Sequence, residues 1–414
     1  MSAESFRFIH ASDFHLERPM ADLDELPEHL REAMVQAPRD AVTSIFDAAI
    51  SERVDFVVLS GDLLQPQIAG PYGLSLLLDG FERLREEGKQ VFWSTGIADD
   101  HTLWPDSIPI PENVTIFPKS QTQVISVLRA GQPICQMVGR SCEGKPRLNV
   151  LDFKVDSSDL FKVGVGYGEV TAEALSTEVF HYWALGGRHQ QSVFRHDDGW
   201  VASYPGTSQG RSLDEPGGHG YQLIDVDADS GIRIQNRFVD SFRYVRLVFN
   251  EREVADFGGL KNLIGDKIYH LQNEHGDCHL LIAWELQITD PHVLGCIDSC
   301  DEILQWAQHE YGSGKPSAWS LSFSIKPPQD YPQSWCEEDT ILGDFLRVSE
   351  KFQEAELGAT NLLPLVEEST SISPDIASRL TEVSDANWSD TLQRATRMGV
   401  ELLRGGTSDG RQHG

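Results

Sequence analysis

The chain has 414 residues, of which 40% are hydrophobic and 24% charged, as expected for a folded protein of about two to three domains. Its 64 acidic and 34 basic residues give a formal net charge of −30. This charge argues against a broad nucleic-acid-binding face, because phosphate binding requires lysine and arginine. Six cysteines without a C-x-x-C pair argue against a disulfide scaffold. The sequence has no signal-peptide pattern and no apolar run of about 20 residues, so we expect a cytoplasmic protein without a membrane span.

Strands and helices alternate at the start of the chain. Apolar runs predict buried strands at residues 6–11, 56–60 and 90–94. Apolar residues at helical spacing predict helices between them, at residues 38–51 and 74–87. Because parallel strands need a crossover connection, this alternation indicates strand–helix–strand units and an α/β fold.

The pattern changes after the third strand. Short strands without intervening helices are predicted within residues 114–141, and buried strands return at 160–165 and 180–185. Residues 192–239 read as hairpins with polar turns. We therefore place the end of the α/β domain near residue 240 and assign residues 1–240 to it.

A small α+β domain is predicted over residues 241–330. Its strands contain alternating or continuous apolar residues, and its helices have one apolar face. In chain order the predicted elements are a strand at 244–249, a helix at 257–271, a strand at 280–284, a helix at 301–311 and a strand at 319–325.

The last part of the chain is predicted to be helical over residues 331–404. A second helix in this segment begins near Ser389, a suitable N-cap residue, and runs to Leu403. Residues 405–414 lack apolar side chains and are predicted to be a disordered tail. The first helix has one apolar face, formed by Ile341, Phe345, Val348 and Phe352.

Asp13 and His15 follow the first predicted strand. Residues two apart in an extended backbone project their side chains to the same side, so this carboxylate and imidazole are predicted to point to one place. The pair suits a divalent cation of borderline softness. By itself an Asp-x-His pair is also common in ordinary loops.

Three further segments follow predicted strands, where α/β sheets place their ligands. Gly61 and Asp62 come after the second strand, and the carboxylate of Asp62 is expected to face the same rim as Asp13. Residues 95–101 follow the third strand, and residues 186–190, which include His189, follow the strand at 180–185. Taken singly, each has an ordinary structural explanation as a turn, a cap or a loop histidine.

In this order and spacing, the four segments resemble the calcineurin-like metallophosphoesterases. The likeness is to their DNA-repair exonuclease branch, which includes the SbcD-type and YhaO-type nuclease subunits. Residues 8–16, 54–63 and 182–190 are similar to that branch's first, second and last motifs, and residues 204–217 resemble a segment that follows the metal site in YhaO-type proteins. The resemblance implies a four-layer α/β sandwich with a small α+β capping domain and C-terminal helices.

The resemblance also implies a set of metal ligands. In the family one divalent ion is held by residues that match Asp13, His15, Asp62 and His189 here. All four have suitable side chains, so one ion, with manganese as the expected metal, is predicted to bind.

The second metal site of the family lacks its ligands here. Isoleucine occupies position 97, tyrosine aligns at position 167 and glycine occupies position 187, where the family has asparagine and two histidines. Ala98 stands where the family has the histidine that stabilises the leaving group. Of this second set only Asp62 is retained, so Ile97, Ala98, Tyr167 and Gly187 mark a lost site.

Two residues are candidates for a catalytic role, although no catalytic residue is assigned. His101 lies close to the missing ligands in sequence and could replace one of them. Arg188 could occupy the vacated metal position and pair with Asp62 or a phosphate, or it could point to solvent. Despite the acidic net charge, a basic strip beside the metal could still exist, and its candidate members are Arg7, Arg188, Arg195 and Arg211.

The expected function is that of a DNA-repair-exonuclease-like metallophosphoesterase with one of its two metal sites and with weakened or lost hydrolysis. The resemblance implies a coiled-coil ATPase of the SMC type as partner, which the C-terminal helices could dock unless they pack on their own capping domain. An active metal-dependent DNA exonuclease with replacement ligands, or a phosphoesterase for a small substrate, are the alternatives. Whether the chain is an enzyme, its substrate, its metal and its oligomeric state are left open by the sequence.

Overall fold

The structure is a computed structural model. It describes residues 4–22, 26–105, 107–155, 158–175, 180–197, 199–250, 257–287, 300–326, 331, 333–354 and part of 392–403. The chain divides into two compact units, the first made of residues 1–246, 272–282 and 311–321, and the second of the remainder. No described helix is both long enough and apolar enough to cross a lipid bilayer. The predicted tail at 405–414 and the start of the helix predicted at Ser389 lie outside the described residues.

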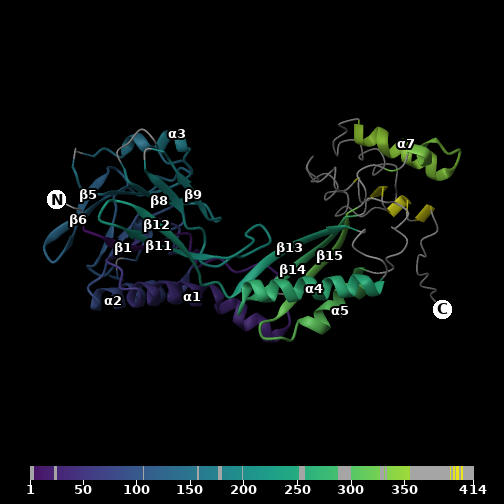
Figure 1. Ribbon diagram of the computed structural model, residues 1–414, viewed down its shortest axis with the longest axis horizontal. Coiled ribbons are helices and arrows are strands. Elements are labelled where there is room, and N and C mark those ends of the chain that lie inside the picture. Colours follow the sequence, from purple (N-terminus) through teal and green to yellow (C-terminus); the bar gives the residue numbers. More distant parts are fainter. Residues whose placement is uncertain are drawn as a thin grey trace. The chain divides into compact units, whose positions relative to one another are not determined.

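The first sheet has six strands in the order β12-β11-β1-β2-β3-β4. Strands β1 to β4 run parallel, whereas β11 is antiparallel to both β1 and β12. Helices α1 (Glu28–Ser51) and α2 (Gly70–Glu86) cover one face, where they enclose an apolar core (Figure 1). The strands are β1 (Phe6–Ala11), β2 (Phe56–Leu59), β3 (Gln90–Trp93), β4 (Val114–Ile116), β11 (Gly220–Val226) and β12 (Ile232–Phe238).

The second sheet also has six strands, in the order β5-β6-β7-β8-β10-β9. Its four inner strands are parallel, and the edge strands β5 and β9 are antiparallel to their neighbours. The strands are β5 (Gln123–Arg129), β6 (Gln132–Gly139), β7 (Lys162–Tyr167), β8 (Tyr182–Gly186), β9 (Ser192–Arg195) and β10 (Val201–Tyr204).

The two sheets pack face to face over aromatic and aliphatic side chains. Phe8 and Phe56 from the first sheet meet Tyr182 and Val163 from the second in one buried cluster. A separate cluster around Trp183 and helix α3 (Ala172–Leu175) covers the outer face of the second sheet. Helices, two sheets and a final helical layer confirm the predicted four-layer α/β sandwich.

Helix α1 begins at Glu28, ten residues before the predicted start, and it includes Pro38. Proline inside a helix removes a hydrogen bond and usually marks a boundary, which is why the sequence favoured a later start. Here Leu30 and Met34 are fully or almost fully buried against Phe242 and other apolar residues of the first unit. This burial stabilises the extra helical turns despite the proline.

Three strands and several helices follow the sandwich. Strands β13, β14 and β15 form a three-stranded sheet in that order, and the boundary between the two units crosses each of them. The predicted domain limits at residues 240 and 330 remain a prediction. The elements are β13 (Phe242–Asn250), α4 (Phe257–His275), β14 (His279–Gln287), α5 (Cys300–Tyr311), β15 (Ala318–Lys326), α6 (Gln333–Glu337) and α7 (Ile341–Glu354).

Candidate metal centre

Asp13 and His15 lie in the loop after β1, in an unusual backbone conformation. Their φ angles are +54° and +43°, in the left-handed region. The backbone N–H of Asp13 donates to the carbonyl of Gly61 at 2.9 Å, and that of His15 donates to the carbonyl of Asp62 at 3.0 Å. The extended backbone expected from the Asp-x-His spacing is therefore wrong, although the two side chains do reach one place. Left-handed conformations of non-glycine residues are costly and are typical of functional loops.

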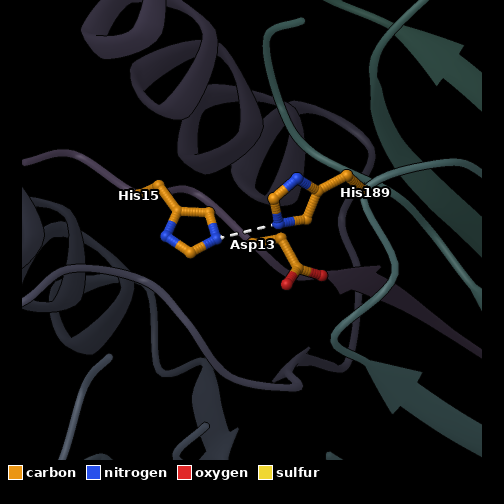
Figure 2. A group of neighbouring side chains, drawn as sticks. All are labelled: Asp13, His15 and His189. Atoms are coloured by element: carbon orange, nitrogen blue, oxygen red, sulfur yellow. Dashed lines mark hydrogen bonds between the residues drawn. The ribbon is translucent and has the colours of Figure 1, made fainter. Parts of the chain in front are cut away.

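Asp13, His15 and His189 form one group of potential metal ligands. One ligand atom from each lies within 4.8 Å of the others. The Nε2 atoms of His15 and His189 are 3.2 Å apart and face each other, and the side chain of Asp13 lies beside them (Figure 2). Two nitrogens bound to one ion at about 2.1 Å lie roughly 3 Å apart. The donor set, one carboxylate and two imidazoles, therefore fits a divalent cation of borderline softness.

A carboxylate contacts the far nitrogen of each imidazole. Nδ1 of His15 lies 3.2 Å from Oε1 of Glu17, and Nδ1 of His189 lies 2.5 Å from Oε1 of Glu215. A proton on each Nδ1 leaves the lone pair of each Nε2 free to bind a cation, the usual carboxylate–histidine–metal arrangement. Burial opposes ionisation of Glu215, but the hydrogen bonds from His189 and from the backbone N–H of Arg211 lower its pKa to about 2.

Arg211 is buried and contacts both the loop that carries His15 and the carboxylate of Glu215. Its side chain donates to the carbonyls of Phe14, His15 and Gln209. Its backbone N–H donates to Oε2 of Glu215 at 2.8 Å. The residue is 6% exposed and its Nε has no hydrogen-bond partner among the described residues. Arg211 thus connects the loop that carries His15 with the carboxylate that orients His189.

Asp13 is fully buried at the centre of the site. Its carboxylate accepts a hydrogen bond from the hydroxyl of Ser12 at 2.5 Å and from the backbone N–H of Gly187 at 3.1 Å. Burial raises the pKa of Asp13, and the nearby charge of Asp62 adds to this rise, while the bond from Ser12 opposes it. A cation bound at the carboxylate would offset this desolvation, which is consistent with a ligand role.

Asp62 lies beside the group rather than within it. Its Oδ2 is 3.7 Å from Nε2 of His15. Oδ1 accepts a hydrogen bond from the backbone N–H of Ala98 at 2.7 Å, and Oδ2 accepts one from the hydroxyl of Tyr167 at 2.5 Å. Both carboxylate oxygens therefore have donors from the chain itself.

The ring of Tyr167 is surrounded by glycines. A Cβ atom added at Gly61 or Gly96 would lie 2.6 Å from this ring, and one added at Gly187 would lie 3.0 Å from it. A larger residue at Gly61 or Gly96 would clash with the tyrosine, and one at Gly187 would fit only tightly against it. Burial and the adjacent charge of Asp62 raise the pKa of Tyr167, so its hydroxyl keeps its proton. Tyr167 thus fills the space beside Asp62, and its hydroxyl donates a hydrogen bond to the Asp62 carboxylate.

The other predicted lost-site positions offer no side-chain ligand. Ile97 is 49% exposed, and Ala98 contributes only its backbone N–H to Asp62. Asp99, the remaining acid of this loop, accepts hydrogen bonds from Leu63 and Trp93, and burial raises its pKa to about 7. Asp99 therefore stabilises the loop at residues 95–101 through these hydrogen bonds.

The two candidate catalytic residues are placed differently. His101 begins a short 3₁₀ helix, His101–Leu103, and its side chain lies outside what the structure describes. The guanidinium carbon of Arg188 lies 4.7 Å from the ring centre of Tyr204 and 5.6 Å from that of Phe194. Arg188 is therefore stacked on aromatic rings, a favourable arrangement for a guanidinium.

The predicted basic strip is wrong. Arg7 lies at the start of β1, at the opposite end of the strand from Asp13, and it pairs with Asp225. Arg195 is likewise remote, since it aligns through Val201 with the first residue of β8. Arg211 is near the site but buried. Arg7 and Arg195 lie at the end of their sheets away from the metal centre. The sequence alone does not show at which end of a sheet a residue lies.

Glu17 and Glu215 are site residues that sequence reasoning did not single out. Glu17 follows His15 by two residues, and Glu215 lies inside the segment 204–217 that resembles the family. A search for carboxylates that can reach the outer nitrogen of each predicted histidine ligand would have suggested Glu17. Glu215 is 26 residues from His189, so only the fold reveals that contact.

Comparison with known proteins finds a curated relative that matches most of this chain. No protein-family model matches the chain. A curated Bacillus subtilis (strain 168) protein, the uncharacterized metallophosphoesterase YhaO, is 27% identical over 332 residues, which cover 76% of this chain and 80% of the relative. The α/β sandwich carries an Asp–His–His group whose side chains could hold a divalent cation. This chain is therefore similar to a metallophosphoesterase along most of its length.

Solved structures with partial similarity include two phosphoesterases. A dimetal phosphatase from Danio rerio is 12% identical and covers 56% of this chain and 96% of its own, with a TM-score of 0.35. The phosphoesterase Yfce from E. coli is also 12% identical and covers 56% of this chain and 98% of its own, with a TM-score of 0.24.

Proposed function

We propose that this protein is a metallophosphoesterase that uses a single divalent cation and hydrolyses phosphodiesters weakly or not at all. The observation that carries the proposal is the pairing of one complete ligand group, Asp13, His15 and His189, with an adjacent carboxylate, Asp62, that Tyr167 already occupies. One half of the site is equipped for a cation, and the other half is filled by a tyrosine ring.

The retained half has what a phosphoester site needs. When bound, a divalent cation polarises a phosphoryl oxygen and lowers the pKa of a bound water. Asp13, His15 and His189 would hold it, while Glu17 and Glu215 keep the two imidazoles in the correct tautomer. Manganese is our proposed metal, as the family resemblance implies.

The other half lacks the groups that speed the reaction. A two-metal mechanism clamps both the attacking and the leaving oxygen with ions roughly 3.5–4 Å apart. Ile97 and Gly187 present no donor side chain there, and Ala98 presents no acid for the leaving group. Loss of a general acid alone removes a factor of roughly 10²–10⁴ in rate. We therefore propose that turnover is low.

Metal content and hydrolysis test the proposal together. The protein is loaded with Mn²⁺ and freed of excess metal, and its manganese content per chain is measured by inductively coupled plasma mass spectrometry. The rate of hydrolysis of bis(p-nitrophenyl) phosphate is measured on the same sample. We expect one ion per chain and little turnover, loss of the ion in Asp13→Ala, and retention in the exposed control Asp214→Ala. Two ions per chain, with turnover abolished by Asp62→Ala, would overturn the proposal and favour the active exonuclease with replacement ligands.

A gain-of-site variant gives a second test. The substitutions Ile97→Asn, Tyr167→His and Gly187→His together restore the ligands that the resemblance implies, and Ala98→His restores the histidine that stabilises the leaving group. We expect this variant to bind a second ion and to gain turnover. A variant that folds but still binds one ion would show that Tyr167 and its neighbours do not determine the metal count.

A role at DNA ends and an SMC-type ATPase partner are finer parts of the proposal, supported by the motif resemblance. Exposed apolar residues on α7, at 74% for Ile341, 49% for Val348 and 42% for Phe352, are consistent with a docking helix. Co-expression with a coiled-coil ATPase of the same organism, followed by size-exclusion chromatography, tests the partner. Val348→Asp should abolish co-elution, and separate elution of the unmodified proteins would contradict it.

A further inference from the structure

A small polar pocket adjoins the candidate metal centre. It has a volume of about 120 Å³ and is lined by the loop between β6 and the 3₁₀ helix Val150–Asp152, together with Tyr167. Tyr167 is also the residue that contacts Asp62. Tyr167 therefore lines the pocket on one side and contacts a carboxylate beside the candidate metal centre on the other.

The pocket is lined by three cationic side chains, of which one is neutralised. Arg140 pairs with Glu143 and Asp152, each at 2.8 Å, and its Nε donates to the carbonyl of Lys119. Lys145 and Arg147 are exposed and have no ion pair with any residue that the structure describes. The two acids of the pocket are already bound to Arg140, so the charges of Lys145 and Arg147 remain available.

Hydrogen bonds to backbone carbonyls fix the loop that carries Lys145 and Arg147. The backbone N–H of Cys142 donates to the carbonyl of Thr95 at 2.8 Å, and its thiol donates to the carbonyl of Lys145 at 3.2 Å. Leu148 donates to the carbonyl of Glu169 at 3.0 Å. A loop fixed at both ends loses little further entropy when it binds a ligand, which favours a binding role over a solvated face.

We propose that this pocket binds a second phosphate group of the substrate, next to the phosphate held at the metal centre. The inference rests on the proposed function, and it goes further by naming the substrate class: molecules that carry at least two phosphates. In a chain with a net charge of −30, two unpaired cations beside the site provide a local attraction for an anion. The second phosphate comes either from a phosphodiester chain or from a small polyphosphate, since both present the same group.

Matched nucleotides test the pocket without relying on turnover. Binding of thymidine 5′-monophosphate, thymidine 3′,5′-bisphosphate and thymidine diphosphate is measured by calorimetry on the Mn²⁺-loaded full chain at about 0.1 M salt. We expect roughly tenfold tighter binding of a two-phosphate ligand than of the monophosphate, since one added charge-assisted contact changes affinity by about that factor. A preference for the bisphosphate identifies a chain-type substrate, and a preference for the diphosphate identifies a polyphosphate.

Charge-matched variants assign the preference to the pocket. In Lys145→Ala/Arg147→Ala the second phosphate loses both of its cationic contacts. The ratio of the affinity for the two-phosphate ligand to that for the monophosphate should therefore fall from about tenfold to about onefold. Arg195→Ala/Arg233→Ala removes two exposed cations that do not line the pocket, and it should keep the preference. Equal affinity for all three nucleotides in the unmodified protein, or an equal loss of preference in both double variants, would overturn the proposal.

Metal analysis of the same samples separates the two proposals. A protein that retains no ion contradicts the proposed function. A protein with its ion in place and no preference for two phosphates contradicts only the pocket.

Discussion

The hydroxyl of Tyr167 donates a 2.5 Å hydrogen bond to the carboxylate of Asp62, at the position where the family resemblance implies a second metal ion. The same carboxylate accepts the backbone N–H of Ala98 at 2.7 Å. The two donors of the chain do for Asp62 what a cation would otherwise do, which is to compensate the burial of its charge.

Removing the hydroxyl of Tyr167 should therefore destabilise the fold. In Tyr167→Phe the buried carboxylate of Asp62 loses a donor, and we expect the free energy of unfolding to fall by about 1–3 kcal/mol. Urea denaturation of the metal-free protein measures it. Tyr204→Phe, which removes a neutral bond to the carbonyl of Gly168, is the control and should cost less. Equal stability of Tyr167→Phe and the unmodified protein would refute a stabilising role for this bond.

Glu215→Gln should weaken metal binding while leaving the fold intact. Glutamine keeps the size of the side chain but loses the charge that orients and polarises the His189 ring. Loss of such an outer partner typically costs 10- to 100-fold in metal affinity, and a Mn²⁺ titration measures it. The neighbouring exposed acid provides the control, Asp214→Asn, which should bind the ion normally. An unchanged affinity in Glu215→Gln would exclude the assigned role.

Arg211→Met should affect both stability and the metal centre. The carbonyls of Phe14 and His15 lose their donor in a buried setting, and we expect unfolding to become easier by about 2–4 kcal/mol. Because the same residue anchors Glu215, metal affinity measured well below the unfolding temperature should also fall. Arg188→Met, at a half-buried arginine stacked on Tyr204, serves for comparison and should have a smaller effect on both. A variant that loses stability but binds the ion normally would limit Arg211 to a structural role.

His10 should make the fold sensitive to acid. Burial lowers its pKa from 6.5 to about 3, although hydrogen bonds to Gln222 and Leu185 oppose this. The unfolded chain binds the proton that the folded chain refuses, so stability is lost as the pH falls below about 6.5. The loss from pH 7 to pH 5 amounts to roughly 2 kcal/mol for one such group. Denaturation curves across this range should show a shallower pH dependence in His10→Gln; identical slopes would contradict a buried neutral imidazole.

The sequence predicted the parts of this protein that depend on local patterns. Apolar runs located the strands of both sheets, and three of the four predicted ligands come together as one group. The predicted backbone conformation was wrong, however. Asp13 and His15 have left-handed backbone conformations, not the extended one expected from their spacing. Hydrogen bonds between two loops fix those conformations, and spacing along the chain carries no information about them.

Long-range contacts account for the rest. Glu215 reaches His189 and Arg211 reaches the loop of His15 only because the fold brings distant segments together. Arg211 was therefore interpreted as part of a surface strip, since a single sequence does not distinguish a buried arginine from an exposed one. The early start of α1 has the same cause, because burial against residues beyond 240 outweighs the proline at position 38.

The glycines around Tyr167 fix the order in which this site can be altered. At Gly187 the backbone has a φ of +94°, and a side chain there would meet the tyrosine ring at 3.0 Å. A histidine introduced at position 187 alone would be strained and obstructed, whereas the same change after Tyr167 has been reduced in size would meet only the strain. A histidine at position 187 should therefore be better tolerated when residue 167 is made smaller first, whereas a change at the half-exposed Ile97 does not depend on that order.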